Sequence, residues 1–179
     1  MTPGAAGRTG NLYAVRTGTR HMKLRDIVVE KAIIAPLKAS KRDEAIRELV
    51  DSLARNGAVA PALVEELSKA VIKREKKGST GFGHGVAAPH VKTMEVQRVF
   101  AAVGIAPGGL EFQALDRQPV HVVFLLLSPE ERPEEHIDAM ECIFGVLTQD
   151  KFRRFLRQAK TPAEVWGLLE EADAASGTA

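Results

Sequence analysis

Two short, largely apolar runs limit the folds open to this chain more than any other feature. They span residues 99–106 and 120–127, and the second contains Val122-Val123-Phe124-Leu125-Leu126-Leu127. Continuous runs of this length, bounded by turn residues, are typical of strands buried on both faces of a sheet. We therefore predict two central strands, with turns at residues 107–109 and 116–119, where glycine and proline gather. His121 lies within the second run, so we expect it to be structural.

Apolar residues at helical spacing predict amphipathic helices before and after these strands. The predicted stripes are Ile46, Leu49, Val50 and Leu53; Leu63, Leu67, Ala70 and Val71; His136, Met140, Ile143 and Leu147; Phe152, Phe155 and Leu156; and Val165, Leu168 and Leu169. Capping boxes are expected at Ser40, Ser128 and Thr161, a helix stop at Gly57 and an edge strand near Pro36. Strands interleaved with helices indicate an α/β domain.

The candidate functional segment is the glycine-rich stretch Gly78-Ser79-Thr80-Gly81-Phe82-Gly83-His84-Gly85-Val86-Ala87-Ala88-Pro89-His90. Glycine lets a backbone turn sharply and approach a ligand closely, and consecutive free N–H groups can form an anion site. Pro89 restricts the direction in which the His90 ring leaves the chain. The expected phosphate-binding donors are the N–H groups of Gly81, Gly83 and Gly85 and the hydroxyls of Ser79 and Thr80, with Arg74 adding positive charge. A phosphorylatable histidine requires groups of this kind.

The same stretch excludes two kinds of nucleotide-binding loop. No Gly-Lys-Ser or Gly-Lys-Thr follows the glycines, as a Walker loop requires, and the G-x-G-x-x-G spacing is missing. Pro89 also blocks the helix into which a dinucleotide-binding loop would lead. On the residues alone, a plain glycine-rich turn with an unrelated histidine stays open. A zinc site formed by His84, His90 and His136 is a further alternative.

Arg74-Glu75 followed by residues 78–90 resembles the signature of the fructose/mannitol-type IIA domain of the bacterial phosphoenolpyruvate:sugar phosphotransferase system. The nitrogen-regulatory IIA protein shares this signature. Residues 120–129, Glu135-His136-Ile137 and Lys151-Phe152-Arg153 are similar to further family segments, so the resemblance covers roughly residues 22–172. Phe82 and Ala88 stand where the family usually has isoleucine. The resemblance implies a mixed central β-sheet flanked by helices on both faces.

The resemblance also implies a phosphocarrier that works without a metal or an organic cofactor. His90 would accept phosphate on Nε2 from phospho-HPr and pass it to a IIB domain, or keep it as a regulatory signal. Arg74 would clamp a phosphoryl oxygen, and His136 would bind the phosphoryl group or orient His90. The likeness of residues 74–81 to the regulatory branch favours regulation over sugar transport. The alternative is an interaction protein that keeps the fold but transfers no phosphate.

Composition adds limits on partners and location. The formal charge is +2, and because residues 1–21 hold three arginines and no acid, the remainder carries −1, which argues against nucleic acid as a partner. The single cysteine, Cys142, excludes an internal disulfide, and no apolar run reaches the roughly 18 residues of a membrane span. We expect a cytoplasmic protein. Its domain should span residues 22–173, between a disordered tail or leader at 1–21 and a frayed end at 174–179.

Overall fold

The central strand β5 (Val120–Pro129) organises the sheet and is buried along its whole length. It pairs antiparallel with β4 (Phe100–Leu110) on one side. On the other side it pairs in parallel with two short strands in succession, β2 (Val86–Ala87) and β3 (His90–Thr93). The last strand, β1 (Gly81–Gly83), forms an antiparallel hairpin with β2. The computed structural model describes residues 21–177, so the expectations for residues 1–20 and 178–179 lie outside the described residues.

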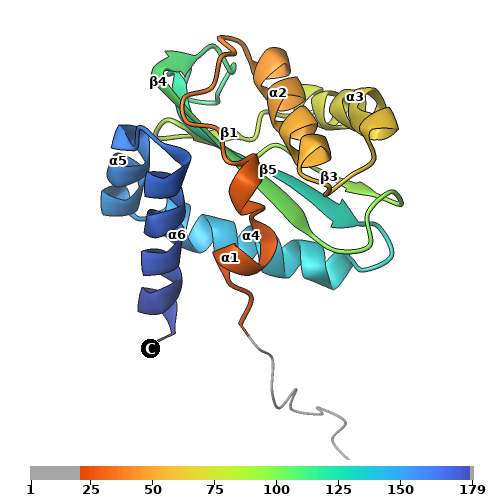
Figure 1. Cartoon of the computed structure of the whole chain (residues 1–179). Helices are drawn as coiled ribbons and strands as arrows, with labels where there is room; N and C mark the ends of the chain where they lie inside the picture. The colour runs from red at the N-terminus through yellow and green to blue at the C-terminus, as the bar shows by residue number, and fades with distance from the viewer. Residues whose placement is uncertain (1–20, 178–179) are drawn as a thin grey trace, which may run out of the picture.

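Helices cover both faces of this sheet (Figure 1). One face carries α2 (Arg42–Arg55) and α3 (Val64–Lys76), and the other carries α1 (Leu24–Ile27), α4 (Pro133–Leu147), α5 (Asp150–Gln158) and α6 (Pro162–Ser176). Two short 3₁₀ turns, η1 (Glu30–Ala32) and η2 (Pro61–Leu63), precede α2 and α3. The predicted α/β fold, a mixed central sheet with helices on both faces, is confirmed. Within residues 21–177, no helix has the length and apolar character needed to cross a membrane.

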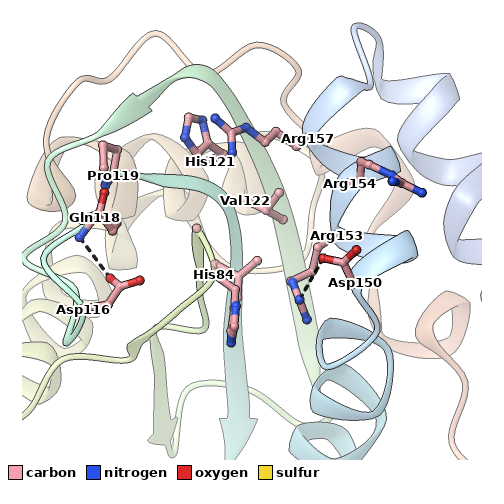
Figure 2. Close-up of a pocket in the computed structure, with 12 residues that line it drawn as sticks. His84, Asp116, Gln118, Pro119, His121, Val122, Asp150, Arg153, Arg154 and Arg157 are labelled. Carbon is pink, nitrogen blue, oxygen red and sulfur yellow. Dashed lines mark hydrogen bonds and ion pairs between the residues drawn. The ribbon is translucent and has the colours of Figure 1, made fainter.

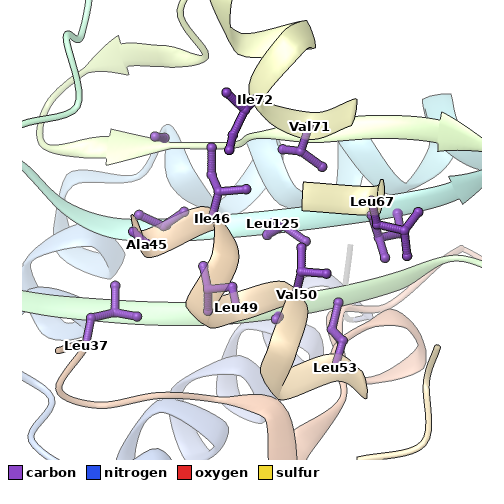
Figure 3. Packing of buried hydrophobic residues seen from close by; sticks show 14 of the residues in the cluster. Leu37, Ala45, Ile46, Leu49, Val50, Leu53, Leu67, Val71, Ile72 and Leu125 are labelled. Atoms are coloured by element: carbon purple, nitrogen blue, oxygen red, sulfur yellow. The ribbon is translucent and has the colours of Figure 1, made fainter. Parts of the chain in front are cut away.

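Alternation along β5 divides the hydrophobic core into two. Val123, Leu125 and Leu127 pack with α2 and α3, as Figure 3 shows for Leu125 among the side chains of both helices. Val122, Phe124 and Leu126 belong to the second cluster, with α1, α4, α5 and α6. Successive side chains of a strand point to opposite faces, so Ser128 shares the α4 face with Leu126. His90 pairs with Leu126 across the β3–β5 ladder and therefore lies on that same face.

The predicted helical stripes are largely confirmed. Ile46, Leu49, Val50 and Leu53 are fully buried, and the buried residues of α3, α4 and α6 fall on the expected faces. The stop at Gly57 is confirmed by its φ of 77° directly after the α2 C-cap. Thr161 caps α6, because its hydroxyl accepts a hydrogen bond from the Glu164 N–H at 3.2 Å. Phe155 is an exception, since it is 41% exposed.

Two of the expected capping boxes are wrong, because the backbone stays extended past both positions. β5 continues through Ser128 and Pro129, and α4 begins only at Pro133 with Arg132 as its N-cap. The chain before α2 likewise stays extended, since the Ser40 carbonyl accepts a hydrogen bond from the Glu111 N–H at 3.0 Å. Lys41 is therefore the N-cap of α2, and no side chain caps this helix.

Three boundaries also differ from the sequence-based expectations. Residues 107–109 belong to β4, where the register shifts between Ile105 and Leu110, so they form an irregular strand segment instead of a turn. The expected edge strand near Pro36 is reduced to isolated bridges, which pair Val28 with Ala101 and Ile34 with Gly104. α6 runs to Ser176, so residues 174–176 are helical where fraying was expected.

Asp173 joins the last helix to the first and provides a test of the fold. Its buried carboxylate accepts hydrogen bonds from the backbone N–H groups of Leu24 at 2.8 Å and Arg25 at 3.0 Å, at the start of α1. Asp173→Ala leaves both donors unpaired, so we expect it to lower the free energy of unfolding by about 2 kcal/mol in urea titrations. Asp173→Asn keeps one acceptor and should cost less. Glu171→Ala, an exposed change on the same helix, is the control, and equal effects of Asp173→Ala and Glu171→Ala would contradict this role.

Candidate phosphoryl-transfer site

His90 begins strand β3 and lies half-buried on the face that α4 covers. Its Nδ1 is 2.8 Å from the carbonyl oxygen of Ala88, two residues earlier. A carbonyl oxygen only accepts hydrogen bonds, so Nδ1 carries the proton and donates it. In a neutral imidazole the other nitrogen, Nε2, then holds a free lone pair. Local backbone geometry therefore leaves Nε2 as the ring nitrogen of His90 that could act as a nucleophile.

His136 faces His90 from the first turns of α4. The two ring centroids are 5.2 Å apart, and the ring planes are inclined by 50°. On its other side, Nδ1 of His136 is 2.8 Å from the hydroxyl oxygen of Ser128. Ser128 is fully buried, and within residues 21–177 this is the one hydrogen bond found for its hydroxyl. A buried hydroxyl left without an acceptor is costly, so Ser128 donates to Nδ1 and the His136 proton resides on Nε2.

The end of α3 brings positive charge to the two histidines. Arg74 lies in the last turn of α3 and donates a hydrogen bond to the Gly78 carbonyl at 3.0 Å, which restrains the chain that follows. Lys92 lies two residues after His90 on β3 and is level with Ser128. The charges of Arg74 and Lys92 both act to lower the pKa values of His90 and His136. Arg74 and Lys92 therefore place two positive charges close enough to His90 and His136 to affect both imidazoles.

Both imidazoles are neutral at pH 7. Burial lowers the pKa of His90, and Arg74 and Lys92 lower it further, although the Ala88 hydrogen bond and Glu75 act in the opposite direction. For His136, burial first, and then His90, Lys92 and Arg74, lower the pKa to about 4. A neutral His90 keeps the Nε2 lone pair needed for nucleophilic attack. A neutral His136 presents one N–H donor with no charge of its own.

Glu75 is an organising residue of the site that the sequence interpretation did not assign. Its carboxylate is 2% exposed and accepts two hydrogen bonds from Thr80, from the backbone N–H and the hydroxyl, each at 2.6 Å. The Thr80 carbonyl in turn accepts a bond from the Ala88 N–H at 3.3 Å. Glu75 therefore fixes the segment that presents the Ala88 carbonyl to His90.

This arrangement shows that several of the groups expected to donate hydrogen bonds to phosphate are already engaged within the protein. The Thr80 hydroxyl is bound to Glu75, and the Gly81 N–H donates to the Ser79 hydroxyl oxygen at 3.2 Å, so neither is free for phosphate. Gly81 serves close packing, because a Cβ there would lie 2.8 Å from that of Ala114. The Ser79 hydroxyl proton is the one expected hydroxyl donor that stays available.

Gly83 and Gly85 lie too far from His90 to bind the same group. They flank the turn between β1 and β2, where Gly83, His84 and Gly85 all have positive φ. β2 begins level with Val122 of β5, whereas His90 is level with Leu126, which puts the turn roughly 13 Å away along the strand. His84 is separated from His90 in the same way, so the alternative zinc site is not assembled. Residues 21–177 contain no group of three or more His, Cys, Asp or Glu side chains arranged to hold a metal.

The sequence thus predicted His90, His136 and Arg74, and the structure brings them together. It missed Ser128, Lys92 and Glu75. Ser128 could have been found, because a polar residue two positions after Leu126, on the same face, is unexpected in a strand buried on both faces. Lys92 follows His90 with the same spacing of two. Glu75 is part of the Arg74-Glu75 signature, but the charged residues around it at the end of α3 gave no indication of its separate role.

Comparison with known proteins places this chain in a family. Residues 26–172 match the family model "Phosphoenolpyruvate-dependent sugar phosphotransferase system, EIIA 2". The nitrogen regulatory protein of Bradyrhizobium diazoefficiens is 32% identical over 149 residues, which cover 83% of this chain and 95% of that protein. Nitrogen regulatory protein IIA-Ntr from Neisseria meningitidis has a similar structure, with a TM-score of 0.71 and 28% identity over 80% of this chain and 97% of that one.

A second similar structure shares the fold at lower identity. It is enzyme IIA for mannitol from Escherichia coli, solved in complex with phosphorylated enzyme IIB, with a TM-score of 0.65 and 24% identity. The match covers 80% of this chain and 96% of that one. The family match over residues 26–172 and the 32% identity carry the assignment. This chain therefore belongs to the EIIA 2 family of the phosphoenolpyruvate-dependent sugar phosphotransferase system.

Proposed function

We propose that this chain is a cytoplasmic phosphocarrier in which Nε2 of His90 receives a phosphoryl group from phospho-HPr. The group then passes to a IIB domain or stays as a signal that controls binding to a regulatory target. The observation that carries the proposal is the 2.8 Å contact of Nδ1 with the Ala88 carbonyl, because it leaves Nε2 as the lone-pair nitrogen. The regulatory role is favoured by the likeness of residues 74–81 to the regulatory branch and by the 32% identity to the nitrogen regulatory protein of Bradyrhizobium diazoefficiens.

In the proposed transfer, the Nε2 lone pair of His90 forms the new P–N bond as the bond to the donor imidazole breaks with its electron pair. The proton on Nδ1 of His90 stays in place, held by the Ala88 carbonyl. Charge on the three equatorial phosphoryl oxygens is then stabilised by nearby donors and cations. Arg74 and Lys92 supply positive charge, and Nε2–H of His136 and the Ser79 hydroxyl supply hydrogen bonds.

Ser128 acts in this proposal as a positioning residue. By donating to Nδ1 of His136 at 2.8 Å, it keeps the His136 proton on Nε2, toward His90 and the phosphoryl group. Without that hydroxyl, His136 could adopt the other tautomer and present a lone pair to the phosphoryl oxygens, which would repel it. The burial of Ser128 and the 5.2 Å spacing of the two rings support this role.

Phosphorylation of His90 can be tested by intact-mass measurement after incubation with phosphoenolpyruvate, Enzyme I and HPr. We expect the mass to rise by one phosphoryl group, and the modification to be labile in acid and stable in alkali. His90→Ala should abolish the gain, whereas His84→Asn, which tolerates the positive φ of that turn, should retain it. A gain that survives in His90→Ala would contradict the assignment. An unmodified wild-type chain would favour the alternative, an interaction protein without transfer.

Ser128→Ala tests the positioning role. We expect the rate of phosphoryl acceptance to fall about tenfold, the scale of one lost hydrogen bond to a charged group. Nitrogen-15 NMR should show the His136 proton on Nε2 in the wild type and divided between the two nitrogens in the variant. Ser68→Ala is a matched control, because Ser68 is also fully buried but its hydroxyl has no partner within residues 21–177. An unchanged tautomer in Ser128→Ala would refute this role.

The pKa of His136 provides a test that is independent of transfer. Because the pKa is lowered to about 4, the His136 ring should stay neutral as the pH falls from 7 to 5 in a carbon-13 NMR titration. Between about pH 6.5 and 4 the unfolded chain binds this proton more readily than the folded chain, so the contribution of His136 to stability decreases as pH falls through that window. A midpoint at 6.5 or above would contradict the described environment.

A further inference from the structure

A cleft that is separate from the His90 site, here called the second cleft, lies at the opposite end of β5. Its volume is about 650 Å³, within the range typical of pockets for small molecules. Helix α5 forms one wall, and the turn between β1 and β2 forms part of the other, together with residues 116–122 (Figure 2). None of its lining residues takes part in the proposed phosphoryl transfer.

The α5 wall presents two arginines without partners. Arg154 and Arg157 lie one turn apart on this helix and both are exposed, and neither side chain has an ion pair or hydrogen bond within residues 21–177. The neighbouring Arg153 is different, since it donates to the Leu147 carbonyl at 2.8 Å and pairs with Asp150 at 3.3 Å. An unpaired guanidinium is a planar, permanently charged donor that suits carboxylate and phosphate. This wall therefore favours an anion.

The opposite wall presents hydrogen-bond acceptors. His121 is 7% exposed and donates from Nδ1 to the Ala106 carbonyl at 3.0 Å, so its Nε2 holds a lone pair. No hydrogen-bond donor meets that nitrogen within residues 21–177, and the His121 ring lines the cleft (Figure 2). Oδ1 of Asp116 accepts from the Gln118 N–H at 3.0 Å, which leaves Oδ2 available as an acceptor. This wall therefore favours a ligand with O–H or N–H groups.

Glycines keep the space beside the His121 ring open. A Cβ on Gly85 would lie 3.3 Å from Cδ2 of His121, and one on Gly109 would lie 3.2 Å from Cε1. Both glycines also have positive φ, at 74° and 83°, which side chains rarely adopt. Glycines therefore flank the nearly buried His121 ring on both sides, and Gly85 and His121 both line the cleft.

We propose that this cleft binds a small organic anion, a phosphate ester or a carboxylate, that also carries hydroxyl groups. Arg154 and Arg157 hold the anionic end, and Nε2 of His121 and the carboxylate of Asp116 accept hydrogen bonds from the hydroxyls. The size of the cleft fits a molecule of a few hundred cubic ångströms better than a folded partner. This site is separate from the proposed phosphoryl site, and the inference does not depend on transfer at His90.

Titration of the nitrogen-15-labelled protein tests the inference with glucose 6-phosphate, citrate, inorganic phosphate and glucose as probes. At about 150 mM salt, which screens long-range attraction, we expect saturable shifts of the Gly85, His121 and α5 amide signals with glucose 6-phosphate or with citrate. The probe that responds distinguishes phosphate ester from carboxylate. Inorganic phosphate should bind more weakly than the hydroxylated probe, and neutral glucose should not bind.

Variants show whether the arginines of the cleft are responsible. Arg154→Ala/Arg157→Ala should raise the Kd at least about tenfold, because two charged hydrogen-bond donors are lost. Lys151→Ala removes a cation from the same helix outside the cleft, and Arg74→Ala removes one from the His90 site. Both controls should change the Kd less than about twofold, as expected for a screened surface charge.

Three results would overturn the inference. The first is the absence of saturable binding by either organic anion. The second is binding that persists unchanged in Arg154→Ala/Arg157→Ala, and the third is an equal loss in Lys151→Ala or Arg74→Ala, which would place the anion elsewhere. Because His90→Ala leaves every cleft residue in place, anion binding should survive in that variant even though phosphorylation does not.

Discussion

The hydrogen-bonded ladder between β3 and β5 is the constraint on which the candidate site depends. It sets His90 level with Leu126 and Lys92 level with Ser128, so that alternation sends His90 and Ser128 to the face covered by α4. A shift of one residue in this register would turn His90 to the α2 and α3 face, away from His136. The ladder is secure because Leu125 and Leu127 anchor β5 in one core while Phe124 and Leu126 anchor it in the other.

Local hydrogen bonds then decide which atoms of the two histidines can react. The Ala88 carbonyl holds the proton of His90 on Nδ1, and Ser128 holds that of His136 on Nε2. Burial keeps both rings neutral, so the positive charge of the site resides on Arg74 and Lys92. Neutral imidazoles beside positively charged Arg74 and Lys92 side chains favour the proposed transfer. The nucleophile keeps its lone pair, while fixed cations attract the incoming phosphoryl group without competing for it.

The elements predicted from periodicity were found, and the errors arose where pairing with distant residues overrides local preference. Ser128-Pro129-Glu130-Glu131 has the pattern of a helix start, yet β3 extends β5 through Pro129 and delays α4 to Pro133. Ser40 resembles a cap, but its backbone is engaged by Glu111. Such contacts join residues far apart in the chain, so they cannot be predicted from local sequence patterns. His90, His136 and Arg74 were predictable because a resemblance to a family, more than spacing, pointed to them.

The glycine-rich stretch shows how one continuous motif can serve two places in a structure. Its last residues, Ala88-Pro89-His90, build the candidate transfer site, whereas Gly83 and Gly85 shape the β1–β2 turn beside the second cleft. Between them, Val86 and Ala87 pair with Val122 and Val123 of the buried strand β5. Because Val86 and Ala87 are held by this pairing, a substitution in the β1–β2 turn should not displace the backbone at His90. The glycines therefore account for backbone turns and close packing, and the groups proposed to bind phosphate at His90 are the side chains of Arg74, Ser79, Lys92 and His136.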